Sequence, residues 1–345
     1  NVLGVLDRSG STGNSMQLQP SADGDQGIVE AGFGAVGRFL ETTTSRIDQV
    51  IAGNVAGSAG TGISTGDETL KWGVWAQGFG SYLKQEPRDA TMGYTAHIWG
   101  TSMGFDRLVS NHSLFGVSGG FAKAYIRTSD TGTRTDADSY QGNLYASYFR
   151  DGWRVDGIVS CAYNRYDGSR HIAFGSVDRL ATSNYGGYQY SGYVEGGYTV
   201  TGGGWNVTPL VSLRYSRLHL NGYTEDGAGS LNLSVDPRDY NMFQSGLGTS
   251  FSHPFRWQGS RLVPELHLKW FYDFIGDRQQ VTSTFTGGGA SFSTEGYDPP
   301  RSSLNAGARL TLINGNGVTV SLNYDLELKK DFYSHAGYAN IRFLF

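Results

Sequence analysis

Three titratable side chains occupy alternate positions in the segment Glu265-Leu-His267-Leu-Lys269. Alternate residues of a β-strand point to the same side, so a carboxylate, an imidazole and an ammonium group would face one compartment. Such a trio has the groups needed for general acid–base catalysis. The same residue types also form polar ladders that only solvate a wet cavity. This second arrangement is much the commoner one, and we favour it.

The remaining residues that could carry chemistry form no motif. A serine hydrolase needs a serine, a histidine and an orienting polar group. Five of the seven histidines are scattered near turns or strand ends: His112, His171, His219, His253 and His335. Metal-ligand spacing is absent, and the glycine-rich segment 286–290 lacks the strand-to-helix context of a phosphate-binding loop. We therefore predict no catalytic residue, no metal and no cofactor.

The composition indicates a β protein that is rich in glycine and aromatic residues. Of 345 residues, 51 are glycine and 13% are aromatic, whereas only 17% are charged, against a usual share of about a quarter. The 8 prolines and the single Cys161 argue against a disordered or disulfide-built chain. The mean hydropathy is −0.35 and no long apolar run occurs, which excludes membrane-spanning helices. A formal net charge of −4 gives no electrostatic footprint for nucleic acid.

The first part of the chain differs from the rest. Residues 1–25 are rich in Ser, Gly and Gln and are typical of a linker, and we expect any export signal to lie upstream. Between Gly27 and Gly53 the apolar residues follow a helical period and share one face: Phe33, Val36, Leu40, Ile47 and Ile51. Gly53 is expected to end this helix, and segment 54–69 is expected to be a flexible connection.

From Trp72 onward the apolar residues alternate with polar ones, as in β-strands with one apolar face. The cleanest segments are 153–164, 205–216, 261–274 and 318–329. A soluble β-sandwich would also alternate, but these strands are longer than its usual five or six residues. Trp153 and Tyr163 lie on the same apolar face, ten residues apart. In a tilted strand this spacing corresponds to a rise of about 24 Å along the barrel axis, which matches the height of about 25 Å of the apolar band between the two aromatic girdles of an outer-membrane barrel. The pattern therefore predicts a transmembrane β-barrel.

We count twelve strands, joined alternately by short turns and by longer connections. Their approximate ranges are 72–84, 94–109, 112–127, 138–150, 153–167, 187–200, 205–220, 240–255, 261–275, 302–313, 318–329 and 333–345. The long connections are 85–93, 128–137, 168–186, 221–239 and 276–300. Outer-membrane barrels keep short turns in the periplasm and long loops outside, so an even strand number puts both barrel termini on the periplasmic side. A helix over 27–53 would be about 40 Å long and could thread the lumen.

Seven segments spread over residues 28–345 carry a family resemblance. They are Ser45-Arg46-Ile47-Asp48, Trp72-Gly-Val-Trp-Ala-Gln-Gly-Phe-Gly80, Gly100-Thr-Ser-Met-Gly-Phe-Asp106, Thr208-Pro209-Leu-Val-Ser-Leu, Val263-Pro264-Glu265-Leu-His-Leu-Lys-Trp270, Leu304-Asn-Ala-Gly-Ala-Arg309 and Tyr338-Ala-Asn-Ile-Arg-Phe-Leu-Phe345. In this order they resemble the translocator domain of a monomeric, AIDA-like autotransporter, a type V secretion protein.

The resemblance implies an all-β fold: a 12-stranded antiparallel transmembrane β-barrel of the Gram-negative outer membrane, with an N-terminal α-helix threading the lumen. It divides the chain into a passenger remnant or linker (1–25), a linker helix with its connection (26–70) and the barrel translocator (71–345). A monomeric protein of this kind secretes its own N-terminal passenger to the cell surface and keeps the helix as an anchor or plug. Its implied partners are outer-membrane lipid, the barrel-assembly machinery, periplasmic chaperones and the passenger, but no nucleic acid. Phe343 and Phe345 resemble the signal that the assembly machinery reads.

The resemblance assigns any enzymatic activity to the passenger and implies that the barrel is not an enzyme. An outer-membrane diffusion pore and a phospholipase-like barrel enzyme remain the alternatives. Some autotransporters cut themselves in the lumen between two asparagines. This sequence has no such pair in or near the helix, where Asn54 stands alone.

The residues that could hold the helix are charged or titratable side chains on the helix and on the polar strand faces. They are Arg38, Glu41, Arg46, Asp48, Arg154, Asp156, Arg214, Glu265, His267, Lys269, Arg309, Asp325, Glu327 and Arg342. Pairing between helix and wall is one interpretation of this set. For any one of them, solvation of a wet lumen explains the polar residue equally well.

Overall fold

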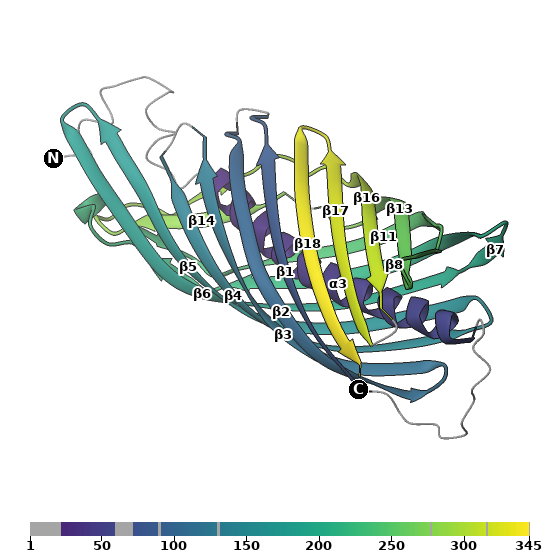
Figure 1. Ribbon diagram of the computed structural model, residues 1–345. Helices are drawn as coiled ribbons and strands as arrows, with labels where there is room; N and C mark the ends of the chain where they lie inside the picture. The colour runs from purple at the N-terminus through teal and green to yellow at the C-terminus, as the bar shows by residue number, and fades with distance from the viewer. Residues whose placement is uncertain are drawn as a thin grey trace.

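Twelve long strands of the computed structural model form an antiparallel barrel around one helix (Figure 1). They are β1 (Trp72–Gln85), β2 (Tyr94–Ser110), β3 (Ser113–Thr128), β4 (Arg134–Arg150), β5 (Trp153–Phe174), β6 (Val177–Tyr198), β8 (Trp205–Leu220), β11 (Arg238–Ser252), β13 (Ser260–Asp273), β16 (Ser302–Ile313), β17 (Val318–Lys329) and β18 (Phe332–Leu344). Each pairs with the next barrel strand along the chain, and β1 pairs with β18 to close the ring. Closure leaves no barrel edge unpaired, as a lipid environment requires. The prediction of a twelve-stranded barrel is confirmed.

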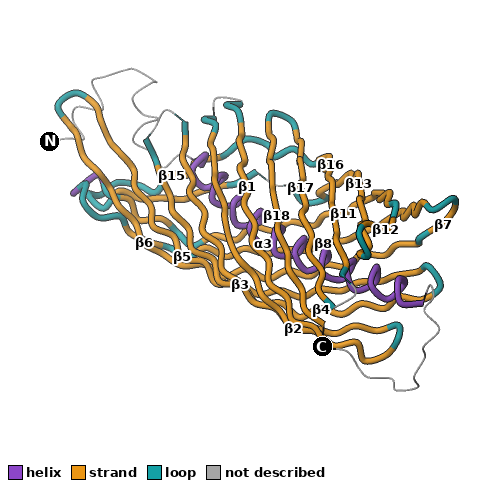
Figure 2. The backbone as a smooth tube through the Cα atoms, in the orientation of Figure 1, coloured by secondary structure: helices purple, strands orange, loops and turns teal. Residues whose placement is uncertain are grey.

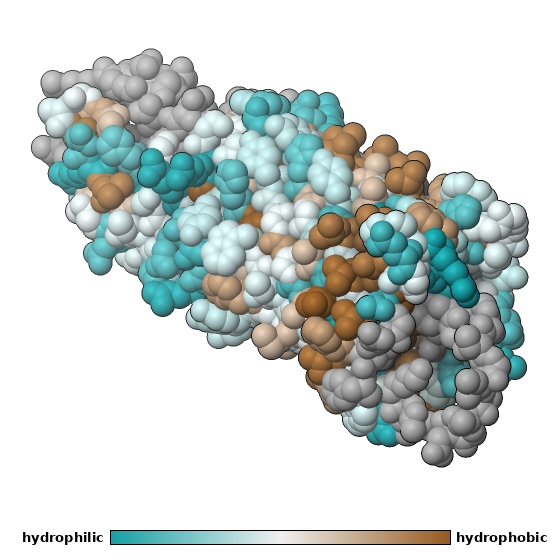
Figure 3. All heavy atoms as spheres, in the orientation of Figure 1, coloured by the Kyte–Doolittle hydropathy of each residue, from teal (hydrophilic) through white to brown (hydrophobic). Residues whose placement is uncertain are grey.

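Side chains alternate between the lumen and the outer wall along the barrel strands. On β5, Val155 and Val159 are exposed on the outer wall, whereas Asp156 and Ser160 are buried inside. On the face that Figure 3 shows, hydrophobic side chains gather on the half nearer the C-terminus, and the opposite end is mostly hydrophilic. This alternation suits a wall that contacts lipid outside and a polar lumen inside.

One helix, α3 (Ala22–Ser58, 37 residues), runs through the lumen (Figure 2). It extends beyond both of its predicted ends, Gly27 and Gly53. A glycine inside a helix costs only about 1 kcal/mol relative to alanine, so Gly53 by itself does not end the helix. Among the described residues, no helix is both long and apolar enough to cross a membrane.

The barrel encloses the helix, and the buried helix residues are not limited to the predicted apolar face. Val36, Leu40 and Ile47 of that face are buried, and Phe33 and Ile51 are partly buried. The polar side chains of residues 42–46 are buried as well, because the barrel surrounds them. Buried polar groups are costly unless they are hydrogen-bonded, so the wall has to supply partners to this helix.

The structure describes residues 22–58, 72–88, 91–129, 132–276, 278–314 and 317–344. Most of the predicted linker 1–25, most of the predicted connection 54–69 and Phe345 lie outside these ranges. The helical state of residues 54–58 shows that the connection begins later than predicted.

The two ends of the barrel differ, and we call them the short-turn end and the long-connection end. Tight turns such as Asp151-Gly152, between β4 and β5, define the short-turn end. Asp48 contacts Arg154 close to this turn, whereas Glu30 contacts Lys329 at the other end of the barrel. The N-terminal end of α3 therefore lies at the long-connection end.

The prediction of a loop over 168–186 is wrong, because β5 and β6 continue as one hairpin to a tight turn. Arg170 binds Glu225 at 2.5 Å, and Ile172 packs in a small core with Leu231. Both partners belong to the connection between β8 and β11. Such tertiary contacts support a hairpin that projects beyond the barrel, and they leave no local sequence pattern.

The predicted long loops 128–137, 221–239 and 276–300 also contain strand residues. A separate four-stranded sheet is formed by β9 (Tyr223–Thr224), β10 (Leu233–Val235), β14 (Gln280–Phe285) and β15 (Phe292–Glu295), with the short helix η1 (Gly229–Leu231) before β10. Two short strands, β7 (Val200–Gly202) and β12 (Phe255–Trp257), extend hairpins at the short-turn end. β4 also starts inside the predicted loop 128–137. The long connections are therefore partly folded as a sheet of their own.

Glycines on the inner faces of β2 and β3 make room for aromatic side chains. A Cβ atom at Gly104 would lie 2.4 Å from the Trp75 ring, and one at Gly120 would lie 2.3 Å from Phe39 of the helix. Both aromatic side chains are buried. Part of the high glycine content therefore comes from this close approach of rings to the wall.

We expect Gly104→Ala to destabilise the barrel by about 1–3 kcal/mol, because the added methyl group overpacks against Trp75. The matched control is Gly78→Ala, since a Cβ atom at Gly78 meets no atom within 4 Å. Thermal unfolding of the purified protein in detergent, followed by its heat-dependent gel mobility, measures both variants. Equal unfolding temperatures for the two would contradict the close packing.

Candidate functional site at the helix–lumen interface

A fully buried ion pair joins the helix to β2. Arg46 donates two hydrogen bonds, from Nε and Nη2, to the carboxylate of Asp106, and the two side chains are 0% and 2% exposed. The Tyr145 hydroxyl donates to the same carboxylate at 2.9 Å, and the Trp75 indole N–H donates to the Tyr145 oxygen at 2.9 Å. Two-point contact of this kind has a strict geometry, so it fixes the position of the helix along the barrel axis.

Asp106 does not belong to the set of residues predicted to contact the helix, although the alternation of inward and outward residues on β2 indicates that it faces the lumen. It continues the inner-face alternation of Ser102 and Gly104 on β2, and an acid on that face is a candidate partner for a helix arginine. Arg342, which belongs to the predicted set, is buried on the inner face of β18 opposite Trp75.

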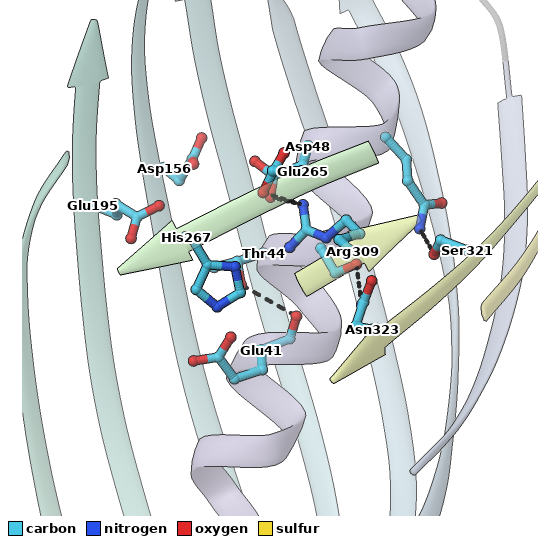
Figure 4. A network of polar contacts seen from close by, with 12 residues as sticks. Glu41, Thr44, Asp48, Asp156, Glu195, Glu265, His267, Arg309, Ser321 and Asn323 are labelled. Carbon is cyan, nitrogen blue, oxygen red and sulfur yellow. Dashed lines mark hydrogen bonds and ion pairs between the residues drawn. The ribbon is translucent and has the colours of Figure 1, made fainter. Parts of the chain in front are cut away.

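Asp48 lies between two arginines of the wall. It is bound by Arg154 of β5 and by Arg309 of β16. Arg154 also pairs with Glu195, which was not predicted, and with Asp156 at 3.7 Å. Arg309 also pairs with Glu265 at 3.6 Å, and Figure 4 shows Asp48, Glu265 and Arg309 close together. A single helix carboxylate thus connects two separate parts of the barrel wall.

Three wall strands hold the N-terminal half of the helix. Arg38 donates hydrogen bonds to the Tyr338 hydroxyl at 3.1 Å and to Ser334 Oγ at 2.9 Å, both on β18. Arg214 of β8 donates to the backbone carbonyl of Phe33 at 2.8 Å. The further ion pairs here are Glu30 with Lys329 at 3.2 Å and Lys329 with Glu327 at 3.6 Å.

Uncharged groups complete the contact with β17. Asn323 donates to Ser45 Oγ at 3.1 Å, and Gln49 donates to Ser321 Oγ at 2.7 Å (Figure 4). The threonine hydroxyls at 42–44 donate to carbonyls of the helix itself, one turn back. These bonds satisfy polar side chains that would otherwise be buried without a partner.

The titratable trio of β13 is divided among separate partners. His267 Nε2 lies 2.7 Å from Asp325 Oδ1, and Lys269 Nζ lies 2.9 Å from Glu195 Oε2. Glu41 of the helix points toward His267 (Figure 4). Because the trio does not converge on one point, its geometry fits charge pairing and not acid–base catalysis. Within the ranges that the structure describes, no group of three or more His, Cys, Asp or Glu side chains could hold a metal ion.

Several wall residues that contact the helix were not predicted. Besides Asp106 they include Ser102, Ser321, Asn323, Lys329, Ser334 and Tyr338. Most are uncharged, and an uncharged polar residue on an inner face does not indicate whether water or a helix lies opposite. Only the tertiary structure distinguishes the two.

Comparison with known proteins gives a consistent result. The sequence matches the family described as Autotransporter beta-domain over residues 74–325. It is 26% identical over 316 residues to Outer membrane protein A of Rickettsia conorii, and 22% identical over 234 residues to Esterase EstA of Pseudomonas aeruginosa. These alignments cover 88% and 66% of this chain but only 15% and 36% of the two relatives. The fold is similar to the translocator domain of the autotransporter NalP from Neisseria meningitidis, with a TM-score of 0.62, 17% identity, and coverage of 88% of this chain and 98% of that one.

Replacing Arg46 by methionine is expected to destabilise the helix-filled barrel by about 3–5 kcal/mol, because Asp106 is left buried and unpaired. Asp106→Leu should lower the free energy of unfolding by a similar amount. The double variant should recover most of the lost stability, because it leaves no unpaired charge buried. Urea unfolding in detergent micelles measures all three.

The control for this double-mutant cycle is Arg165→Gln. It breaks the ion pair between Arg165 and Asp167, whose side chains are 57% and 54% exposed, respectively. It should cost less than about 1 kcal/mol. If the losses of unfolding free energy in R46M and D106L simply add in the double variant, the two residues are not energetically coupled.

Proposed function

This chain belongs to the autotransporter β-domain family and is an outer-membrane translocator domain, and we propose that it exports its own N-terminal passenger and then keeps the helix as a tether. The Arg46–Asp106 pair is the observation that carries this proposal. A buried two-point ion pair holds the helix in the lumen at one position. The surrounding contacts of Arg38, Ser45 and Asp48 support the same position from other strands.

We place the long-connection end outside the cell and both barrel termini on the periplasmic side. Short periplasmic turns and longer outer loops are the rule for outer-membrane barrels. The N-terminal end of α3 lies at the long-connection end, so a passenger upstream of Ala22 would leave the barrel on the cell surface. The chain after Ser58 would then return to β1 at the periplasmic side.

We propose that the barrel is not an enzyme and that it works as a monomer. Its partners would be outer-membrane lipid, periplasmic chaperones, the barrel-assembly machinery and the passenger. Phe343 is exposed on the outer wall, where an assembly factor could contact it during insertion. The esterase name of one relative belongs to a protein of which this chain covers only about a third.

The passenger would stay joined to the helix under this proposal. Asn54 is the only asparagine of α3, so the helix offers no Asn–Asn pair for cleavage in the lumen. The contacts of Arg46 and Asp48 with the barrel wall would then anchor the whole secreted part to the membrane.

Surface exposure tests the orientation. An epitope inserted between Gly175 and Ser176, in the β5–β6 turn, should bind antibody on intact cells that express the chain with an export signal. The same epitope between Gln258 and Gly259, in a turn at the short-turn end, should bind only after the outer membrane is permeabilised. The reverse pattern would overturn the proposed orientation.

Single-channel conductance in a planar bilayer tests the position of the helix. The whole chain should give a small or flickering conductance, and a version lacking residues 1–68 should give a large and stable one, because α3 occupies the lumen. The full chain with Gly78→Ala serves as the control for handling and insertion. Equal conductance with and without residues 1–68 would place the helix outside the lumen and favour a pore or a barrel enzyme.

A further inference from the structure

One face of α3 lines open space inside the barrel. Residues spaced by three, four or seven positions share a face of a helix, and this face carries Glu30, Gly37, Glu41, Thr44 and Asp48. All five line cavities in the lumen. The face turned away from them carries Phe39 and Thr43, which are fully buried.

The open space consists of two cavities that follow each other along the helix. One, of about 240 Å³, lies toward the long-connection end and is bounded by Arg214 of β8 and by the ends of β11, β13 and β17. The other, of about 910 Å³, lies toward the short-turn end and is bounded by Arg154, Glu265 and Arg309. Each is far larger than the roughly 10–15 Å³ that one water molecule needs, and charged side chains line both, so both would be hydrated.

The two cavities meet at a layer that contains charged side chains. Glu41 and Thr44 line both of them. Across from this part of the helix, Lys269 lies 2.9 Å from Glu195, and the Tyr193 hydroxyl donates to Glu195 at 2.7 Å. Tyr193 lines the cavity toward the long-connection end, while Lys269 and Glu195 line the cavity toward the short-turn end. This row of side chains therefore separates the two water-filled spaces.

We propose that small ions cross the barrel beside the helix, through these two half-channels, with Glu41 and the Lys269–Glu195 pair as the gate between them. The route differs from the opening produced when the helix leaves the lumen. It rests on the proposed function only in that the barrel must span the membrane with α3 inside. Fixed charges at a constriction decide which ions pass, so Lys269 disfavours cations there and Glu41 favours them.

Two substitutions at the gate test the proposal by conductance and by reversal potential in a potassium chloride gradient. Lys269→Ala should raise the conductance of the full chain by more than about twofold, because the constriction is the largest resistance in series, and should shift selectivity toward potassium. Glu41→Gln should shift selectivity toward chloride. The matched control is Gln141→Ala, on the inner face of β4 and outside both cavities, which should change neither quantity.

Cysteine labelling shows whether the helix stays in place while ions pass. In a Cys161→Ser background, which removes the exposed native thiol, Gly37→Cys should react with a small charged thiol reagent and lose conductance. Thr43→Cys on the packed face should not react. Labelling of both positions would show that the conducting state has lost its helix, which would overturn the proposal.

The results also separate this proposal from the proposed function. If both gate variants conduct like the unmodified chain while the version lacking residues 1–68 opens widely, the side passage is wrong and the lumenal tether stands. If removal of residues 1–68 changes nothing either, the lumenal position of the helix is itself wrong.

Discussion

A polar helix is enclosed on all sides by the barrel, and each charge that it buries needs a counter-charge from the wall. Arg46 shows the constraint most clearly, since it has no exposed surface and would be strongly destabilising without Asp106. The wall meets the constraint with side chains from distant strands, including Tyr145 and Trp75 around the same carboxylate. The position of the helix along the barrel axis depends on these pairs. The side of the membrane from which a passenger would leave depends on them as well.

The two sides of the helix are held by different physical means. Toward β1 to β4 the contact is dry: Phe39 packs edge-to-face on Phe79 with ring centroids 5.2 Å apart, and Gly120 provides the space. Toward β6 to β16 the contact is wet, and charged side chains around Glu41 border cavities. Ion pairs are weaker where water can reach them, so each ion pair on the wet side stabilises the helix less than a dry one, and the cavities there leave room for ions.

Insertion in the membrane and retention of the helix use opposite faces of the same strands. Outward residues such as Val159 and Leu322 are exposed on the outer wall, where lipid would lie, while their inward neighbours Ser160 and Ser321 are buried on the lumen side. A substitution can therefore change how the helix is held without changing the lipid-facing surface. This separation allows a translocator to hold its helix firmly in a barrel whose outer wall has the ordinary pattern of its class.

The sequence by itself determined the barrel, because a strict period of two over long strands gives one face to lipid and one to water whatever the neighbours are. It also determined that a helix precedes the barrel, but its set of charged inner-face residues did not include Asp106 and Lys329, which both pair with the helix. Local patterns cannot show which strand stands opposite a given side chain of the helix, so the pairing of Arg46 with Asp106 and of Asp48 with two arginines was decided only by tertiary structure. The projecting β5–β6 hairpin was missed for the same reason, since a small core with the following connection supports it and leaves no periodic signal in either segment.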